Sequence, residues 1–82
     1  MGNKKYQELL KLRGKIIAEG YDLKTVAKKI GLSYNAFRNK IKGETAFTIN
    51  EVYELAVILN IDKEEIITYF FEEMLRNAGK GA

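Results

Sequence analysis

The stretch GLSYNAFRNKIKG, residues 31–43, decides how this chain folds and what its surface offers. A glycine and a serine stand at its start, and such residues end one helix and cap the next. Apolar side chains then recur at helical spacing until Gly43. We therefore expect a helix over residues 34–42, preceded by a three-residue turn at residues 31–33.

This expected helix has two different faces when its residues are placed at about 100° intervals. Its apolar side chains cluster within about 60° and should point inward. They are Tyr34, Phe37 and Ile41. The opposite strip spans about 100° and carries amide and cationic ends. Its members are Asn35, Arg38, Asn39 and Lys42. Two asparagines in nine residues lower helix stability, which favours a binding role over a plain solvated face.

Four further helices are expected around this one, with short connections between them. Asp22 is a good N-cap, and residues 48–51 and 62–65 have the capping-box pattern. The five helices should span about residues 4–19, 23–30, 34–42, 49–59 and 63–77, with residues 78–82 a disordered tail. The sequence thus predicts a compact all-α domain over residues 1–77.

Two of these helices carry a predicted core stripe. In the first helix the stripe is Tyr6, Leu9, Leu10, Arg13, Ile16 and Ile17, widened by Leu12. In the fourth helix the inward residues are Val52, Leu55, Ala56 and Leu59.

Composition excludes several classes of function. The 82 residues contain no cysteine and no histidine, so the thiolate and imidazole groups of common nucleophiles, general bases and metal sites are absent. We expect no enzyme, no cofactor and no small-molecule ligand. The first residues lead into a charged segment instead of an apolar leader, and no apolar run is long enough for a membrane span. A cytoplasmic protein without a membrane partner is expected.

Charge is distributed unevenly along the chain. Residues 1–43 carry eleven Lys or Arg against three acids, a net charge of +8. Residues 44–82 carry three against eight, a net charge of −5. A basic half of this kind favours a polyanionic partner, although an ordinary mixed surface can also show such asymmetry. Lys28 and Lys29 on the second helix either add long-range attraction to DNA or simply keep the protein soluble.

Two short helices joined by a glycine-containing turn of three residues form a helix-turn-helix signature, here over residues 22–43. The stretch YDLKTVAKKIGLSYNAFRNKIKG resembles the Cro/C1-type (XRE-like) helix-turn-helix family of phage repressors over roughly residues 9–66. The segment NKIKGETAFTINEVYELAVILNIDKEEIITYFF is similar to short phage or mobile-element regulators of Gram-positive bacteria. The positions that match the family pattern include Gly20, Val26, Ala27, Ile30, Gly31, Leu32, Ser33, Phe37 and Gly43.

The resemblance implies a lambda-repressor-like domain that binds double-stranded DNA, with the helix over residues 34–42 in the major groove. The family's base-reading positions fall on Ser33, Tyr34, Asn35 and Asn39. Arg38 is suited to guanine and Lys42 to a phosphate. Lys40 and the loop over residues 44–47, which includes Thr45, should border the sugar-phosphate backbone. Tyr34 either packs at the core edge or contacts a thymine methyl group.

Two positions depart from the family pattern. Leu23 stands where members usually have a glutamine that contacts a phosphate. Lys40 stands where members bury an apolar side chain, and the apolar residue is shifted to Ile41. The shift either rotates the recognition helix slightly or brings Ile41 into the core, with the Lys40 stem lying along apolar surface and its charge reaching out.

The expected fifth helix carries more apolar surface than one small core can bury. Ile67, Phe70, Phe71 and Met74 form one stripe. Either this helix simply covers the bundle, or Phe70, Phe71 and Met74 form the interface of a homodimer that binds a palindromic operator. A repressor that occupies its operator is the function expected from these observations.

Two other functions are compatible with the same sequence features. One is a protein-interaction module, such as an antitoxin or antirepressor, that shares the fold but reads DNA weakly. The other is a nonspecific RNA or DNA binder, for which the sequence offers no evident aromatic stacking platform.

Overall fold

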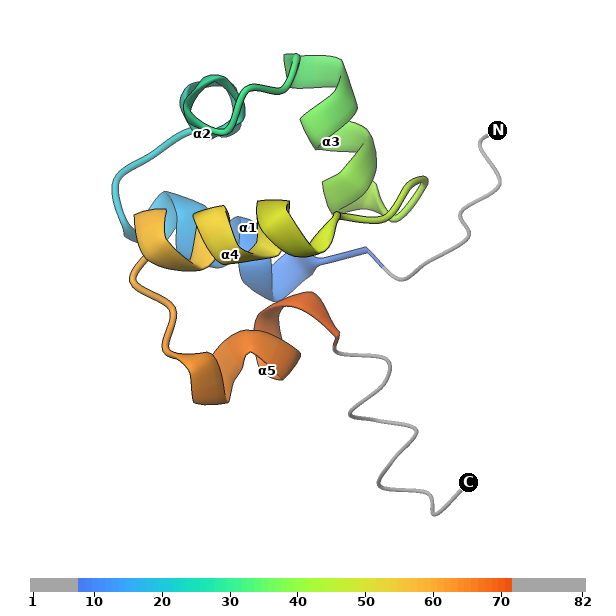
Figure 1. Ribbon diagram of the computed structural model, residues 1–82. Coiled ribbons are helices and arrows are strands. Elements are labelled where there is room, and N and C mark those ends of the chain that lie inside the picture. The colour runs from blue at the N-terminus through green and yellow to red at the C-terminus, as the bar shows by residue number, and fades with distance from the viewer. Residues whose placement is uncertain (1–7, 72–82) are drawn as a thin grey trace, which may run out of the picture.

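The computed structural model describes residues 8–71, and the only regular secondary structure in this range is helical. Their order is α1 (Leu10–Ala18), α2 (Leu23–Lys29), α3 (Tyr34–Lys42), α4 (Ile49–Ile58), a 3₁₀ helix η1 (Lys63–Glu65) and α5 (Ile66–Phe70). Helix α4 crosses in front of α1, with α2 and α3 at one end of the molecule and α5 at the other (Figure 1). The predicted all-α fold class is confirmed. No helix within the described residues is long and apolar enough to cross a bilayer.

Helices α1 to α4 all end in the same hydrogen-bonded turn. A residue with positive φ follows each helix, and the residue after it donates its N–H to the carbonyl five positions back. These donor–acceptor pairs are Tyr21–Ile16, Leu32–Ala27, Glu44–Asn39 and Ile61–Ala56. This Schellman arrangement gives partners to carbonyls that a helix end leaves free. Three of the four donors are apolar and pack in or on the core, so the turn also anchors the chain.

Side-chain caps start α2, α3 and α4 where the sequence predicts them. Asp22 Oδ1 accepts the Thr25 N–H at 2.7 Å, and Ser33 Oγ accepts the Ala36 N–H at 3.1 Å. At α4, Thr48 and Glu51 form a complete capping box, with bonds of 3.1 and 2.9 Å. Hydrogen bonds from Thr25, through its side chain and then its backbone, hold the pKa of the Asp22 carboxyl below its ordinary value.

The core lies where α1, α2, α3 and α4 meet. Its fully buried side chains include two each from α1, α2 and α3. Two more come from α4 and the residue that ends it. Together they are Leu12, Ile16, Val26, Ala27, Phe37, Ile41, Leu55 and Leu59. A backbone hydrogen bond of 2.8 Å from the Leu9 N–H to the Ile41 carbonyl also joins the start of α1 to the end of α3. The bond satisfies a carbonyl that α3 itself leaves without a partner.

A loop aromatic connects this core to α5. Phe47 lies between Phe37 and Phe70, with ring centroids 5.8 Å from each and the rings edge to face. Edge-to-face rings add to the free energy of burial because the positive edge of one ring meets the negative face of the other. The loop between α3 and α4 therefore contributes a side chain that holds α5 in place.

The predicted stripe of the first helix is partly wrong. Helix α1 begins at Leu10, and its buried residues follow the register of Leu12 and Ile16. Leu10, Arg13 and Ile17, which were expected to face inward, are exposed. The early part of the expected helix, including Tyr6, lies outside the described residues. A stripe of six apolar or long side chains was wider than the face that one small core covers.

The second predicted capping box does not form. The Asp62 side chain makes no capping hydrogen bond. The Glu65 N–H, which a capping box directs to that side chain, donates instead to the Asp62 backbone carbonyl at 2.8 Å. This bond spans three residues and makes the first turn a 3₁₀ helix. The expected end of the fifth helix near residue 77, and the expected tail, lie outside the described residues.

Replacing glycine by alanine should have opposite effects on stability at Gly31, in the turn before α3, and at Gly14, within α1. Gly31 has φ of +79°, and a Cβ there would meet nothing within 4 Å. Gly31→Ala should therefore destabilise the fold by about 1–2 kcal/mol through backbone strain alone. Gly14 lies within α1 with equally open space. Gly14→Ala should stabilise the fold by about 0.5–1 kcal/mol through helix propensity.

Urea unfolding followed by circular dichroism measures both free energies of unfolding. Changes of the same sign in the two variants would contradict the assignment of Gly31 to a left-handed turn.

Candidate nucleic-acid interface

Helices α2 and α3 form a closely packed pair at one end of the molecule. Only residues 31–33 separate them, and Figure 1 shows α2 nearly end-on beside α3, so the two helices cross steeply. Ala27 is buried between them, and its carbonyl accepts the Leu32 N–H at 2.9 Å. A small side chain at this crossing permits the close approach. The capped start of α3 is thereby held at the molecular surface.

Helix α3 turns Phe37 and Ile41 inward and its polar strip outward, as the helical wheel predicts, whereas Tyr34, which the wheel placed on the inward face, is exposed. Phe37 and Ile41 are buried in the core. On the other side Asn35 and Arg38 are exposed, while Asn39 and Lys42 are half-buried at the edges of the strip. The structure brings the four predicted residues together on one surface, with Asn35 and Arg38 as its most accessible members.

Tyr34 belongs to this surface and not to the core. Its side chain is 45% exposed, and the Arg38 guanidinium lies 6.0 Å from the centre of its ring. A cation over an aromatic face is attracted by the ring quadrupole, and the contact limits where the guanidinium can move. Of the two alternatives for Tyr34, packing at the core edge is therefore not what the structure shows.

The remaining predicted contacts have different surroundings. Ser33 is exposed and uses its hydroxyl oxygen as the α3 cap, while Thr45 is exposed in the loop that follows α3. Leu23, where the family pattern has a polar residue, is half-buried and packs against the core. Its side chain therefore stabilises the α2 start by burial and offers no polar atom to a ligand.

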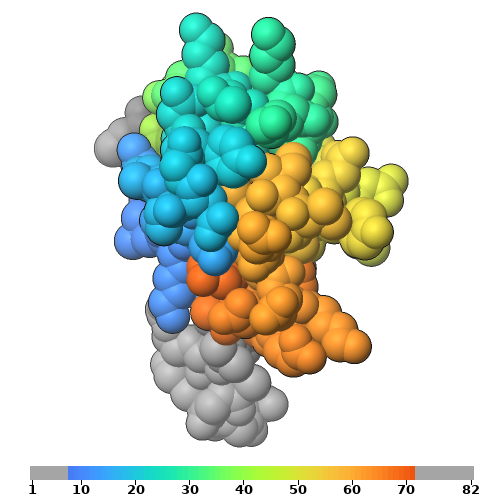
Figure 2. Space-filling model, turned by 90° about the vertical axis from the view of Figure 1, so that its left-hand side faces the viewer, coloured from blue at the N-terminus to red at the C-terminus, as the bar shows by residue number. Residues whose placement is uncertain are grey.

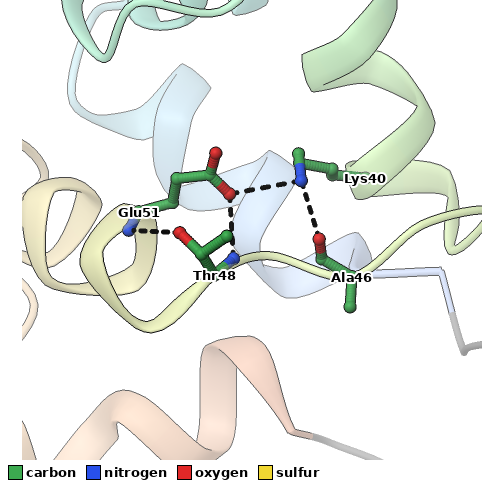
Figure 3. A network of polar contacts seen from close by, with 4 residues as sticks. All are labelled: Lys40, Ala46, Thr48 and Glu51. Carbon is green, nitrogen blue, oxygen red and sulfur yellow. Dashed lines mark hydrogen bonds and ion pairs between the residues drawn. The ribbon is translucent and has the colours of Figure 1, made fainter.

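Lys40, which was expected to border a DNA backbone, has polar partners within the protein itself. Its Nζ donates to the Ala46 carbonyl at 2.7 Å and lies 3.2 Å from Glu51 Oε1 (Figure 3). Its side chain is only 14% exposed, and its ammonium lies 5.8 Å from the centre of the Phe47 ring. The charge is thus used to join α3, the following loop and the capped start of α4.

The shift from Lys40 to Ile41 has a clear structural outcome. Ile41 takes the buried position, and the Lys40 side chain, largely buried itself, brings its ammonium to polar partners. The same Glu51 oxygen accepts the Thr48 N–H and faces the Lys40 ammonium (Figure 3). Sequence reasoning found the Glu51 capping box but missed Lys40, since nothing local in the sequence links the two.

Pairing of Lys40 leaves two cations on the outer part of α3. Among the described residues, Arg38 and Lys42 form no ion pair. Lys28 and Lys29 are exposed on the adjacent α2, and the Lys29 ammonium lies 5.7 Å from the centre of the Tyr21 ring. The α2–α3 end of the molecule therefore presents amides and positive charge together.

The residues predicted for a dimer contact differ in how far they are exposed. Phe70 is 6% exposed and packs on Phe47 within the core, so placing it in an interface does not fit its burial. Ile67 and Phe71 are partly exposed, and Met74 lies outside the described residues. Helix α5 covers the bundle through contacts with α1, as one alternative expected.

The described residues also contain no group of three or more acidic, histidine or cysteine side chains that could hold a metal ion. The outer side of α3 offers amide and guanidinium hydrogen-bonding groups to a ligand.

A family model described as "Protein of unknown function (DUF739)" matches residues 6–73 of the chain. The chain belongs to this family. The match covers α1 through α5, so the whole described fold lies within the DUF739 region. No curated protein and no solved structure matches the chain.

The Lys40 contacts predict a stability effect that distinguishes it from its neighbour. Lys40→Met keeps an apolar stem but leaves the Ala46 carbonyl and Glu51 without their charged partner. We expect a loss of about 1–3 kcal/mol in the free energy of unfolding. Lys42→Met is the matched control and should change that free energy by less than about 0.5 kcal/mol. Equal losses in urea unfolding of the two variants would contradict the role given to Lys40.

Proposed function

We propose that this DUF739 protein is a sequence-specific DNA-binding transcriptional regulator of the Cro/C1 helix-turn-helix type. In this proposal α3 enters the major groove of double-stranded DNA, α2 crosses the backbone, and occupation of an operator excludes competing proteins. The observation that carries the proposal is the outer face of α3, where exposed Asn35 and Arg38 lie opposite buried Phe37 and Ile41.

The chemistry of this face suits the edges of base pairs. An asparagine amide can pair with N6 and N7 of adenine, and an arginine guanidinium with O6 and N7 of guanine. Arg38 is restrained over the Tyr34 ring, so less conformational freedom is lost when it binds. The exposed part of the Tyr34 ring is available to a thymine methyl group.

Contacts to phosphates would surround these base contacts. Lys42 lies at the end of α3, and exposed Ser33 and Thr45 lie before and after the helix. Lys28 and Lys29 on α2 add positive charge that attracts DNA over a longer range. Lys40 is not included, because its ammonium already has two protein partners. Its role in the proposal is to hold α3 against α4.

A homodimer fits this mode of recognition. One α3 reaches only a few base pairs, and a two-fold dimer doubles the site by reading a palindromic operator in two half-sites. A cytoplasmic location, where such an operator is accessible, is part of the same proposal. If a DNA selection fails, the favoured alternative is a protein-interaction module, such as an antitoxin or antirepressor, with weak DNA readout.

The first test is selection of DNA sequences by the purified chain from a random double-stranded library at low salt. The proposal expects an enriched palindromic motif. Enrichment of no sequence and no retention of DNA at low salt would rule the proposal out.

The second test separates base reading from phosphate contact on the selected operator. Asn39→Ala should cost about 1–3 kcal/mol of operator binding with little effect on random DNA, since it removes a contact to a base edge. Asn35→Ala should act in the same way. Lys42→Ala should weaken binding to both DNAs and reduce the slope of log affinity against log salt by about one.

Lys63→Ala is the matched charge control for these measurements. Lys63 is exposed in η1, at the end of the molecule opposite α3 (Figure 1). Its removal should leave operator affinity nearly unchanged. An effect of Lys63→Ala as large as that of Lys42→Ala would show that binding depends on overall charge and not on α3.

A further inference from the structure

Helix α4 has an outward apolar face that the fold leaves uncovered. Ile49, Tyr53 and Val57 are 87%, 70% and 63% exposed. They are spaced four residues apart, so at about 100° per residue they fall within about 80° of one another. Figure 2 shows the start of α4, in yellow, at the right-hand side of the molecule, and its later residues, in light orange, at the surface nearer the centre of the view.

From this face we infer that α4 is the self-association surface of the protein, with a second copy of the chain as its occupant. The contact would be an antiparallel α4–α4 pair around a two-fold axis at Tyr53. This inference names the dimer surface of the proposed DNA-binding function, but the contact itself does not require DNA.

The absence of charge on this face favours a second copy over an unlike partner. The arc within about 60° of Tyr53 on either side contains only uncharged residues, although charged residues make up 30% of the chain. Besides the three apolar residues the arc holds Asn50 and Ala56. A two-fold contact brings each patch against its own copy, so any net charge on the patch would repel itself. Glu54 lies about 100° away, at the rim of the contact.

The spacing of the stripe is also self-complementary. Ile49 and Val57 are each four residues from Tyr53, and both are β-branched. An antiparallel pair centred on Tyr53 therefore sets Ile49 of one protomer beside Val57 of its partner, at both ends of the contact. Tyrosine is enriched at the centre of interfaces because it combines a large apolar area with few rotatable bonds.

The geometry of the pair places both α3 helices on one side of the dimer. In Figure 1, α4 runs horizontally across the front and α3 lies above it. The two-fold axis of an antiparallel pair formed by the front of α4 is vertical in this view. Rotation about a vertical axis leaves α3 at the top in both protomers. The two polar strips can then face one DNA duplex together.

Other exposed apolar residues meet these conditions less well. Leu10 and Ile17 on α1 share their face with Arg13, which lies about 40° from Ile17, so a two-fold contact there would bring two Arg13 charges together. A single-helix contact is small compared with the roughly 1,200–2,000 Å² that stable complexes bury. The dimer should therefore be weak, dependent on concentration, and strengthened when both protomers bind one DNA molecule.

Sedimentation velocity of the full chain without DNA tests the inference. We expect the wild type to shift from monomer to dimer between low and high micromolar concentration. Tyr53→Glu should raise the dimer dissociation constant about tenfold or more, because a charge is forced into the centre of the contact. Ile17→Glu is the matched control at a comparably exposed apolar residue of α1, and it should leave the dissociation constant unchanged.

Cross-linking adds a readout that does not depend on a destabilising charge. The chain contains no cysteine, so Tyr53→Cys introduces a single thiol. Only a residue next to the two-fold axis meets its own copy, and Tyr53→Cys should therefore form a disulfide-linked dimer under mild oxidation. Ile17→Cys should remain monomeric under the same conditions.

Two results would overturn the inference. One is a chain that stays monomeric at high micromolar concentration, which would assign the α4 face to an unlike partner. The other is a dimer unaffected by Tyr53→Glu, which would assign self-association to another surface. A dimer that selects no DNA would remove the proposed function and leave this contact standing. A monomer that binds selected DNA as single half-sites would do the reverse.

Discussion

The directions of α2, α3, α4 and η1 depend on a left-handed residue at the end of the helix before each of them. Gly20, Gly31, Gly43 and Asn60 each reverse the chain within a turn that also satisfies the last carbonyls of a helix. Glycine adopts this backbone region without a Cβ penalty, and asparagine tolerates it. Because the connections are so short, the steep crossing of α2 and α3 follows from the turn itself. The exposure of the α3 polar strip follows in turn from that crossing.

A second constraint acts between the two halves of the chain. Lys40 comes from the basic half and Glu51 from the acidic half, and their ion pair lies where α3, the loop and α4 meet. Both side chains are about 15% exposed or less, so their charges interact more strongly than they would in open water. One cation of the basic half is therefore used within the fold and not only for attraction to a polyanion.

Much of this fold is predictable because its signals are local. Caps such as Asp22 and Ser33 and stops such as Gly43 act within four residues, and the bounds of α2, α3 and α4 agree with prediction to within one residue. The inward register of α1, the position of Phe47 between two aromatic rings, and the pairing of Lys40 depend on distant segments. No local pattern reports such contacts. The outward stripe of α4 is different, since its four-residue spacing is visible in the sequence once the inward residues are assigned.

The link between Lys40 and Glu51 has a consequence for how such a protein can diversify. It attaches α3 to α4 at a point that belongs neither to the polar strip of α3 nor to the apolar stripe of α4. Residues on the outer side of α3 can therefore be exchanged without altering the angle between the two helices. In the proposed dimer, the distance between half-sites becomes a property of α4 and its attachment, while the identity of the bases remains a property of α3. Sequence preference and operator spacing could then change independently among members of the family.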